Sequence, residues 1–436
     1  MSSASPQDTP SLIDRALRVF GDVRPGEGRH ALVMFLNVFL LLLAYYILKT
    51  VREPLILTTG GAELKSYAAG AQAAVLLGYV PLYGWLVSSL SRSRLIVTVV
   101  LGFVACIQLF VLGGRAGVPF LGFAFYVWVG IFSLTMIAQF WSFANDIYAK
   151  DEGSRLFPLI AVGSTAGAPL GAASAQALFA TGMSPFMMME IAAALLLIHL
   201  FLYTRVWSRP SVNAGVEKPS RAGGFTMVLA DPYLRLVALL LVLLNIVNST
   251  GEFILARLVT ERAAELAAAS PDFDRAAFIG AFYGSYFFWV NIASVVLQAL
   301  LVSRVVKRFG FAGVLLALPI LAFGAYGAAA LGAGLVAVRV IKTAENSADY
   351  SMMNTAKQML WLPTTREQKF KAKQAIDTFF VRFGDLMAAG VVFVGTRYLA
   401  LGPGGFAISN VIVVSFAIFV AVRLVAAYNR LTAQAQ

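Results

Sequence analysis

Long apolar runs separated by short polar segments dominate the chain. Twelve of these runs are about as long as a helix that crosses a bilayer, which needs roughly 20 residues. Six runs precede and six follow a polar stretch over residues 204–235. The predicted spans are 31–48, 67–90, 95–112, 118–143, 156–180, 186–203, 236–255, 278–302, 314–330, 335–352, 375–394 and 406–424. The pattern predicts an all-α polytopic membrane protein.

The arrangement of the spans also predicts a duplication. Arg92 follows the second span and Arg308 follows the eighth, while Asn145 follows the fourth and Asn354 follows the tenth. Parallel six-helix halves joined by a linker are typical of major facilitator transporters. We therefore divide the chain into a cytoplasmic N-terminal segment (1–30), a first six-helix half (31–203), a cytoplasmic linker (204–235) and a second six-helix half (236–428).

The N-terminal segment contains a short amphipathic pattern. Ser11 and Asp14 have the spacing of a capping box, which starts a helix. Apolar residues at helical spacing follow on one face: Leu12, Ile13, Ala16, Leu17 and Phe20. This predicts a short helix on the inner membrane surface, and a poorly ordered tail is the alternative.

Composition strengthens the membrane assignment. Hydrophobic residues make up 59% of the chain and charged residues only 13%, with a mean hydropathy of +0.78, whereas soluble domains carry about 25% charged residues. This excludes an ordinary soluble enzyme, a disordered chain and a nucleic-acid-binding domain. Most of the 34 basic residues fall in segments that are cytoplasmic if the N-terminus is inside, so we expect both termini in the cytoplasm. Lys65 is assigned to the short outside loop between the first two spans.

The chain offers little to a metal or a cofactor. His30, His199 and Cys106 are its only histidines and its only cysteine, which excludes most zinc, iron–sulfur and disulfide frameworks. Phosphate-binding, zinc-protease and dinucleotide motifs are missing from the sequence. We expect no metal, no cofactor and no enzymatic activity.

Ionisable residues inside the predicted spans are the candidate functional residues. Such residues are costly in lipid and usually mark a pathway or a binding site. They are Lys49, Arg52 and Glu53 in the first span segment, Glu252 in the seventh, Arg339, Lys342, Glu345 and Asp349 in the tenth, and Arg382 and Asp385 in the eleventh. Spans one, four, seven and ten line the central cavity of facilitators, so we expect the groups in spans one, seven and ten to face a cavity. The alternative is internal pairing, or snorkelling from helix ends.

Small residues four apart predict close helix packing. They are Gly163, Gly167 and Gly171 in the fifth span, and Gly280 and Gly284 in the eighth. This spacing lets helices approach closely in lipid, either between the two halves or within one half.

Three segments resemble the ATP/ADP translocase family, the nucleotide transporters of plastids and obligate intracellular bacteria. They are 48–53, 140–159, which includes Trp141 and Asn145, and 350–377, which includes Lys357 and Asp377. The first loop motif reads Phe140-Trp141-Ser142-Phe143-Ala144-Asn145-Asp146, and the second ends in Lys369-Phe370-Lys371-Ala372-Lys373-Gln374-Ala375-Ile376-Asp377. The resemblance covers all twelve spans loosely.

The resemblance implies a facilitator fold in a bacterial inner membrane, working on nucleotides, and we expect a monomer. By position, Arg52 corresponds to the family's phosphate-binding lysine and Glu252 to its seventh-span glutamate. The chain departs from the family in two places. Apolar residues surround Val129 where the family has a glutamate, and Asp385 stands where the family has a lysine.

These observations favour a secondary transporter that moves a nucleotide, or a related phosphorylated anion, by alternating access. The predicted substrate-binding residues are Lys49, Arg52, Glu252, Arg339, Lys342 and Arg382. The predicted ion-pair, gating or proton-coupling residues are Glu53, Glu345, Asp349 and Asp385. Two alternatives are a proton-coupled facilitator for an uncharged or zwitterionic solute and a membrane scaffold or sensor without transport.

Overall fold

The structure is a computed structural model that describes residues 11–18, 22–207, 223–365 and 367–434. Within these residues the chain is helical and forms no β-strand. The helices are α1 (Leu12–Leu17), α2 (Gly28–Ser89), α3 (Arg92–Arg115), α4 (Leu121–Ile147), α5 (Lys150–Ala180), α6 (Pro185–Thr204), α7 (Gly224–Ala230), α8 (Pro232–Ala269), α9 (Arg275–Leu297), α10 (Ser303–Ala330), α11 (Leu335–Ala348), α12 (Asn354–Met359), α13 (Lys373–Ala375), α14 (Val381–Arg397) and α15 (Pro403–Gln434). Short π-helical turns lie at η1 (Gln298–Val302), η2 (Asp349–Met353), η3 (Gln368–Ala372) and η4 (Ile376–Phe380).

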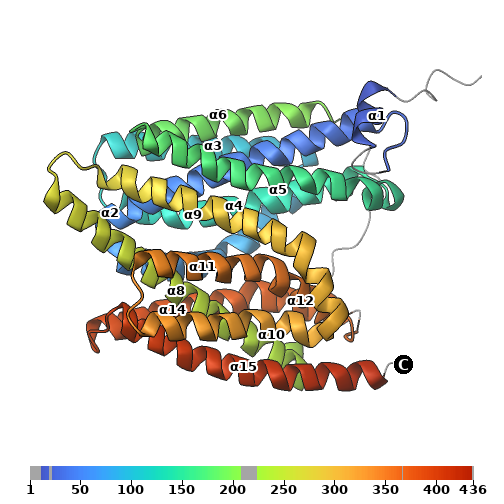
Figure 1. The fold of residues 1–436 in the computed structure, drawn as a ribbon. Coiled ribbons are helices and arrows are strands. Elements are labelled where there is room, and N and C mark those ends of the chain that lie inside the picture. Colours follow the sequence, from blue (N-terminus) through green and yellow to red (C-terminus); the bar gives the residue numbers. More distant parts are fainter. Residues whose placement is uncertain (1–10, 19–21, 208–222, 366, 435–436) are drawn as a thin grey trace, which may run out of the picture.

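The long helices form one bundle (Figure 1). Helix α1, the start of α5, α12 and the end of α15 lie at one end of the bundle, and the connections from α8 to α9 and from α10 to α11 lie at the other. One apolar core is formed mainly by α2, α4, α5, α6 and α9, and a second is formed mainly by α8, α10 and α15. The all-helical membrane fold expected from the sequence is confirmed.

In the described part of the chain, nine helical stretches are long and apolar enough to cross a membrane. Two of them, Gly28–Ser89 and Arg275–Ala330, each cover two of the spans predicted above. The predicted tenth span is not among the nine, because α11 is only 14 residues long and is rich in charged side chains. Most of the predicted linker, residues 208–222, lies outside the described residues, as do the first ten residues and Phe20.

The first two predicted spans are the two legs of α2, which meet at a kink. Gly61 adopts φ +66° there, a backbone conformation that glycine tolerates and other residues rarely adopt. The second leg therefore begins directly after the kink rather than at residue 67. This corrects the assignment of Lys65 to an exposed outside loop, since its side chain is buried inside the bundle.

Helix α1 docks on the start of α2 through one buried carboxylate. The predicted capping box is confirmed, with Asp14 accepting from the backbone N–H of Ser11 at 2.8 Å. Asp14 also accepts from the backbone N–H groups of Gly26, at 3.2 Å, and Gly28, at 2.8 Å. Burial alone would raise the pKa of Asp14, but the hydrogen bonds from the Ser11 hydroxyl and these N–H groups outweigh it and lower the pKa to about 2.

Beside this contact, the carboxylate of Glu27 forms a bidentate ion pair with the guanidinium of Arg155 at the start of α5. Both N–O distances are 2.8 Å. The hydrogen bond from Arg155 lowers the pKa of Glu27. The N-terminal segment is thereby tied to both α2 and α5.

The spaced glycines serve two different contacts. A Cβ at Gly167 would lie 2.5 Å from the carbonyl oxygen of Phe39, so α5 packs directly on the backbone of the first leg of α2. A Cβ at Gly284 would lie 2.8 Å from the backbone of Gln176, so α9 packs on α5. Helix α5 therefore packs closely against two partners, which are far apart in the sequence.

Candidate substrate cavity

A polar cavity of about 270 Å³ lies where α2, α4, α8, α9, α11 and α14 meet. It is lined by Lys49, Arg52, Lys65, Ser66, Ala69, Gln72, Tyr126, Asn245, Asn248, Ser249, Glu252, Phe253, Phe287, Asn346, Tyr350, Arg382 and Asp385. Both legs of α2 contribute, because the kink at Gly61 folds the second leg back beside the first. Four cationic side chains and two carboxylates face this space, so its lining is net positive.

The first group of charges joins the two legs of α2. Glu53 is fully buried and its carboxylate pairs with Arg52 at 2.7 Å and with Lys65 at 2.7 Å. The guanidinium of Arg52 also lies over the ring of Tyr126, 4.1 Å from its centre. One buried carboxylate thus holds two cations at the cavity wall.

Glu252 on α8 links this group to the next. Its carboxylate accepts hydrogen bonds from the hydroxyl of Tyr286, at 2.8 Å, and from the amide of Asn346, at 3.0 Å. The ammonium groups of Lys65 and Lys342 lie 3.6 Å and 3.8 Å away. Glu252 therefore sits between cations from α2 and α11.

Lys342 lies behind the wall rather than in the cavity. Its side chain is fully buried, and its ammonium pairs with Glu345 at 2.9 Å and donates to the Asn248 side chain at 2.9 Å. The hydroxyl of Tyr326 donates to the same carboxylate of Glu345 at 2.5 Å. Because both charges are satisfied within the protein, they hold α8, α10 and α11 together.

Lys49 is the cavity cation without an acidic partner. Among the described residues, no carboxylate lies within 4 Å of its ammonium group. The ammonium instead lies over the rings of Phe287, at 4.3 Å, and Tyr46, at 5.0 Å. Cation–π contacts stabilise the charge and leave its hydrogen-bond donors available to an anion.

Arg382 and Asp385 form the expected ion pair on α14, at 3.3 Å. Asp385 also accepts from the amide of Asn245, at 2.8 Å, and the hydroxyl of Ser249, at 2.9 Å. Both partners belong to α8, so the carboxylate joins α14 to α8 while it faces the cavity.

Other predicted residues lie elsewhere. Arg339 lines a separate pocket, where it donates to the hydroxyl of Ser285. Its guanidinium is directed toward α9, whereas the ammonium of Lys342, three residues further on, is directed toward Asn248 on α8. Asp349 lies in the π turn after α11 and pairs with Lys357 at 3.2 Å, outside the cavity lining.

The loop-motif residues are also outside the cavity. The ring of Trp141 packs edge-on against that of Phe157, which joins the end of α4 to α5. The amide of Asn145 donates to the carbonyl of Trp141 at 2.8 Å. Asp377 lies in the π turn before α14 with an exposed side chain.

Lys65, Gln72 and Tyr126 are among the lining residues that the sequence prediction missed. The adjacent pair Gly60 and Gly61 is the signal that would have placed Lys65, since it permits a turn too short for an exposed loop. Gln72 and Tyr126 had no such signal, because single polar or aromatic residues in a span are common. No group of three or more His, Cys, Asp or Glu residues in the described ranges is placed to hold a metal ion.

Taken together, the apolar helical bundle and the charged cavity inside it define a polytopic membrane carrier. The TLC ATP/ADP transporter family matches residues 16–112. The ADP,ATP carrier protein 1 of Chlamydia muridarum is 26% identical over 463 residues, covering 86% of this chain and 84% of the carrier. The protein of the same name from Chlamydia trachomatis is 25% identical, covering 82% and 80%.

Solved structures support the fold. The nucleoside transporter NupG matches with a TM-score of 0.62 and 13% identity, covering 91% of this chain and 98% of that one. A bacterial homologue of the iron transporter ferroportin matches with a TM-score of 0.64 and 13% identity, covering 91% and 98%. The sequence relatives, which are carriers by name, confirm the resemblance to the ATP/ADP translocase family.

Proposed function

We propose that the protein exchanges adenine nucleotides across a bacterial inner membrane by alternating access, with the polar cavity as the binding site. The observation that supports this most is the excess of cations in the cavity lining, in a chain related to ADP,ATP carriers. Charge-assisted contacts between cations and phosphate are strong in a low-dielectric site. No hydrolysis is involved.

In this proposal, Lys49, Arg52 and Arg382 contact the phosphates directly, together with Lys65. Lys49 is the first to contact a phosphate, because its ammonium need not break an ion pair with a carboxylate to do so. Glu252 positions Lys65, while Lys342 and Glu345 support the wall from behind. Arg339 is not part of this site, and Asp349 takes part only through its pair with Lys357.

The proposed architecture is twelve spans in two halves, 31–203 and 236–428, joined by the linker 204–235, with both termini in the cytoplasm. The ammonium of Lys65 on α2 and the carboxylate of Glu252 on α8 then join the two halves at 3.6 Å. Alternating access requires this contact to loosen when the cavity opens. An anion that draws Lys65 away from Glu252 would favour that step.

Asp385 sets the charge of the preferred substrate. Its carboxylate neutralises Arg382, whose charge would otherwise be offered to phosphate. We therefore expect the protein to bind AMP or ADP at least as tightly as ATP, and the Asp385→Lys variant to shift the preference toward ATP. Asp385→Asn should shift it in the same direction but less, because it removes one negative charge without adding a positive one.

Thermal-shift titration of the purified protein and both variants with ATP, ADP, AMP and adenosine tests this ranking. Adenosine is the control for recognition without phosphate. A wild-type protein that binds ATP more tightly than AMP, with a ranking unchanged in both variants, contradicts the role of Asp385. A wild-type protein that binds none of the four contradicts the nucleotide proposal and favours a proton-coupled carrier of another solute.

A further inference from the structure

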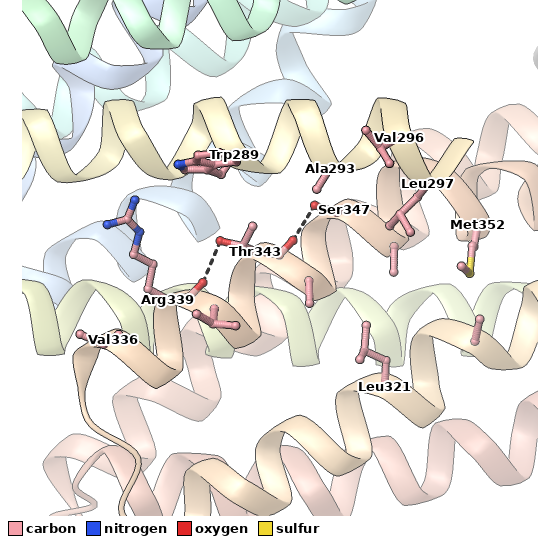
Figure 2. A pocket seen from close by; sticks show the side chains of 14 residues that line it. Trp289, Ala293, Val296, Leu297, Leu321, Val336, Arg339, Thr343, Ser347 and Met352 are labelled. Carbon is pink, nitrogen blue, oxygen red and sulfur yellow. Dashed lines mark hydrogen bonds between the residues drawn. The ribbon is translucent and has the colours of Figure 1, made fainter. Parts of the chain in front are cut away.

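A second and larger pocket, of about 770 Å³, lies between α9, α10 and α11 on the outside of the bundle. Figure 2 shows it as an elongated space running along α11 from Val336 and Arg339 toward Met352. Met352 is 13 residues beyond Arg339, a rise of about 20 Å along a helix. One leaflet of the hydrocarbon core is about 15 Å deep, so the groove is long enough to hold one acyl chain.

The walls of this groove are apolar. The hydroxyls of Thr343 and Ser347 in its lining donate to backbone carbonyls within α11, at 2.8 Å and 2.6 Å (Figure 2). Ala293 on α9 and Ala344 on α11 are both in the lining, and their small side chains leave space between the helices. Arg339 is the one charged side chain in the lining.

The groove opens outward rather than into the substrate cavity. Val336 is 79% exposed, Val340 is 63% exposed and Trp289 is 53% exposed. In a protein that spans a membrane, such a surface faces lipid. An occupant of the groove therefore enters from the bilayer, whichever solute the cavity carries.

Arg339 is held in place and has unused donors. Its guanidinium donates one hydrogen bond to the hydroxyl of Ser285, at 2.6 Å, and lies over the ring of Phe282, 5.1 Å from its centre. Among the described residues, no carboxylate lies within 4 Å of it. A guanidinium has five N–H donors and can bind a phosphate with two of them at once.

The position of Arg339 suits a headgroup. It lies in the second turn of α11, close to the end of the helix that begins at Leu335. An arginine deep in hydrocarbon is costly, whereas one near a helix end can reach the phosphate layer. A single cation at the mouth of an apolar groove is complementary to a molecule with one anionic head and an apolar tail.

We propose that this groove binds an anionic phospholipid, with the headgroup phosphate on Arg339 and one acyl chain along α11. The lipid would then be a structural part of this face. Its headgroup would be held by Arg339, which contacts α9, and its acyl chain would lie between α9, α10 and α11. The site is distinct from the substrate cavity, so the proposal does not depend on which solute is transported.

The test is native mass spectrometry of the delipidated full chain, titrated with phosphatidylglycerol or with phosphatidylcholine of the same acyl chains. We expect wild type to retain phosphatidylglycerol about tenfold more than phosphatidylcholine, a factor that corresponds to about 1.4 kcal/mol. Arg339→Gln should remove that preference. Ala344→Phe, which fills the groove but keeps the charge, should lower retention of both lipids.

Matched controls separate a site from general attraction. Arg397→Gln makes the same charge change at the end of α14. Arg397 lies at the same end of the bundle as Arg339, because the start of α15, which follows it, lies close to the end of α10, which precedes α11. A Cβ at Gly404 would lie 3.7 Å from the carbonyl of Ala330. Val422→Phe also introduces a phenylalanine, at an exposed position of α15. Both controls should behave as wild type.

Three results would overturn the proposal. One is an Arg339→Gln variant that keeps the wild-type preference for phosphatidylglycerol. Another is a loss in Arg397→Gln as large as that in Arg339→Gln. The third is displacement of the lipid by excess inorganic phosphate, which would make the site one for a free anion and leave the groove without a role.

Discussion

At the residue scale, Lys49 and Glu53 show how neighbouring charges can have different roles. The carboxylate of Glu53 is fully buried between two cations, Arg52 and Lys65. The ammonium of Lys49 instead lies over the aromatic rings of Tyr46 and Phe287. The carboxylate of Glu53 therefore stabilises the protein, while the ammonium of Lys49 is available to a substrate.

This difference predicts opposite phenotypes. Glu53→Gln leaves two cations without their carboxylate, so we expect a loss of stability of about 3–5 kcal/mol, the usual effect of breaking a buried pair.

Lys49→Gln should leave the melting temperature close to wild type and weaken nucleotide binding about tenfold, since a hydrogen bond to a charged group contributes about 1.5–3 kcal/mol. Lys150→Gln, the same change at an exposed position outside the cavity, is the control. Melting curves and binding titrations of the three variants give both quantities, and a Lys49→Gln variant that binds as wild type contradicts the assignment.

At the element scale, the sequence predicts the helices well and the short turns poorly. Long apolar runs decide where helices lie, because unpaired backbone groups are not tolerated in lipid. The kink at Gly61 depends on one backbone conformation that hydropathy does not detect, and the assignment of Lys65 failed for that reason. The pair of Arg382 and Asp385 was predictable because residues three apart on a helix are neighbours. The separation of Arg339 from Lys342 was not predictable from the sequence, because it depends on which helices pack around α11.

Helix α11 offers a direct test of its two faces. Asn346 lines the polar cavity, whereas Val340 faces the apolar groove. In a background without the native cysteine, Cys106→Ser, we expect Asn346→Cys to react with a charged, water-soluble thiol reagent and Val340→Cys to react at least tenfold more slowly. Bound nucleotide should protect only the first. Equal reactivity at the two positions, or protection at neither, contradicts the assignment of the faces.

The docking of α1 depends on Asp14. Asp14→Ala leaves the N–H groups of Gly26 and Gly28 without their acceptor. Only Gly28 is buried, so the cost is about 1–3 kcal/mol for that one donor. Limited proteolysis should then cut the N-terminal segment faster, by about tenfold, while Asp272→Ala, at an exposed position between α8 and α9, should leave the rate unchanged. Equal rates for Asp14→Ala and wild type would mean that this carboxylate does not hold α1.

The same contact predicts a pH dependence. The folded-state pKa of Asp14 is lowered from 3.8 to about 2, so its stabilising contribution is complete above about pH 4 and is lost as the pH falls toward 2. The cleavage rate of the wild-type segment, corrected for the protease's own pH dependence, should therefore be constant between pH 5 and pH 8. A rise in that rate within this window would show that another group controls the docking.

At the scale of the whole molecule, the fold and the charges have separate origins. The helical bundle follows from hydropathy, and its fold is shared with solved transporters of 13% identity. The cavity charges come from helices far apart in the sequence, such as α2, α8 and α14. Function therefore depends on the site rather than on the fold.

Counterflow in liposomes tests nucleotide exchange most directly. Purified protein is reconstituted into vesicles loaded with ADP or left empty, and uptake of labelled ADP is followed, with Lys49→Gln as the matched variant. We predict rapid uptake only into loaded vesicles, no response to an imposed pH gradient, and uptake reduced about tenfold in Lys49→Gln at subsaturating ADP. Uptake that a pH gradient drives into empty vesicles, or no uptake into loaded ones, would contradict nucleotide exchange through this cavity.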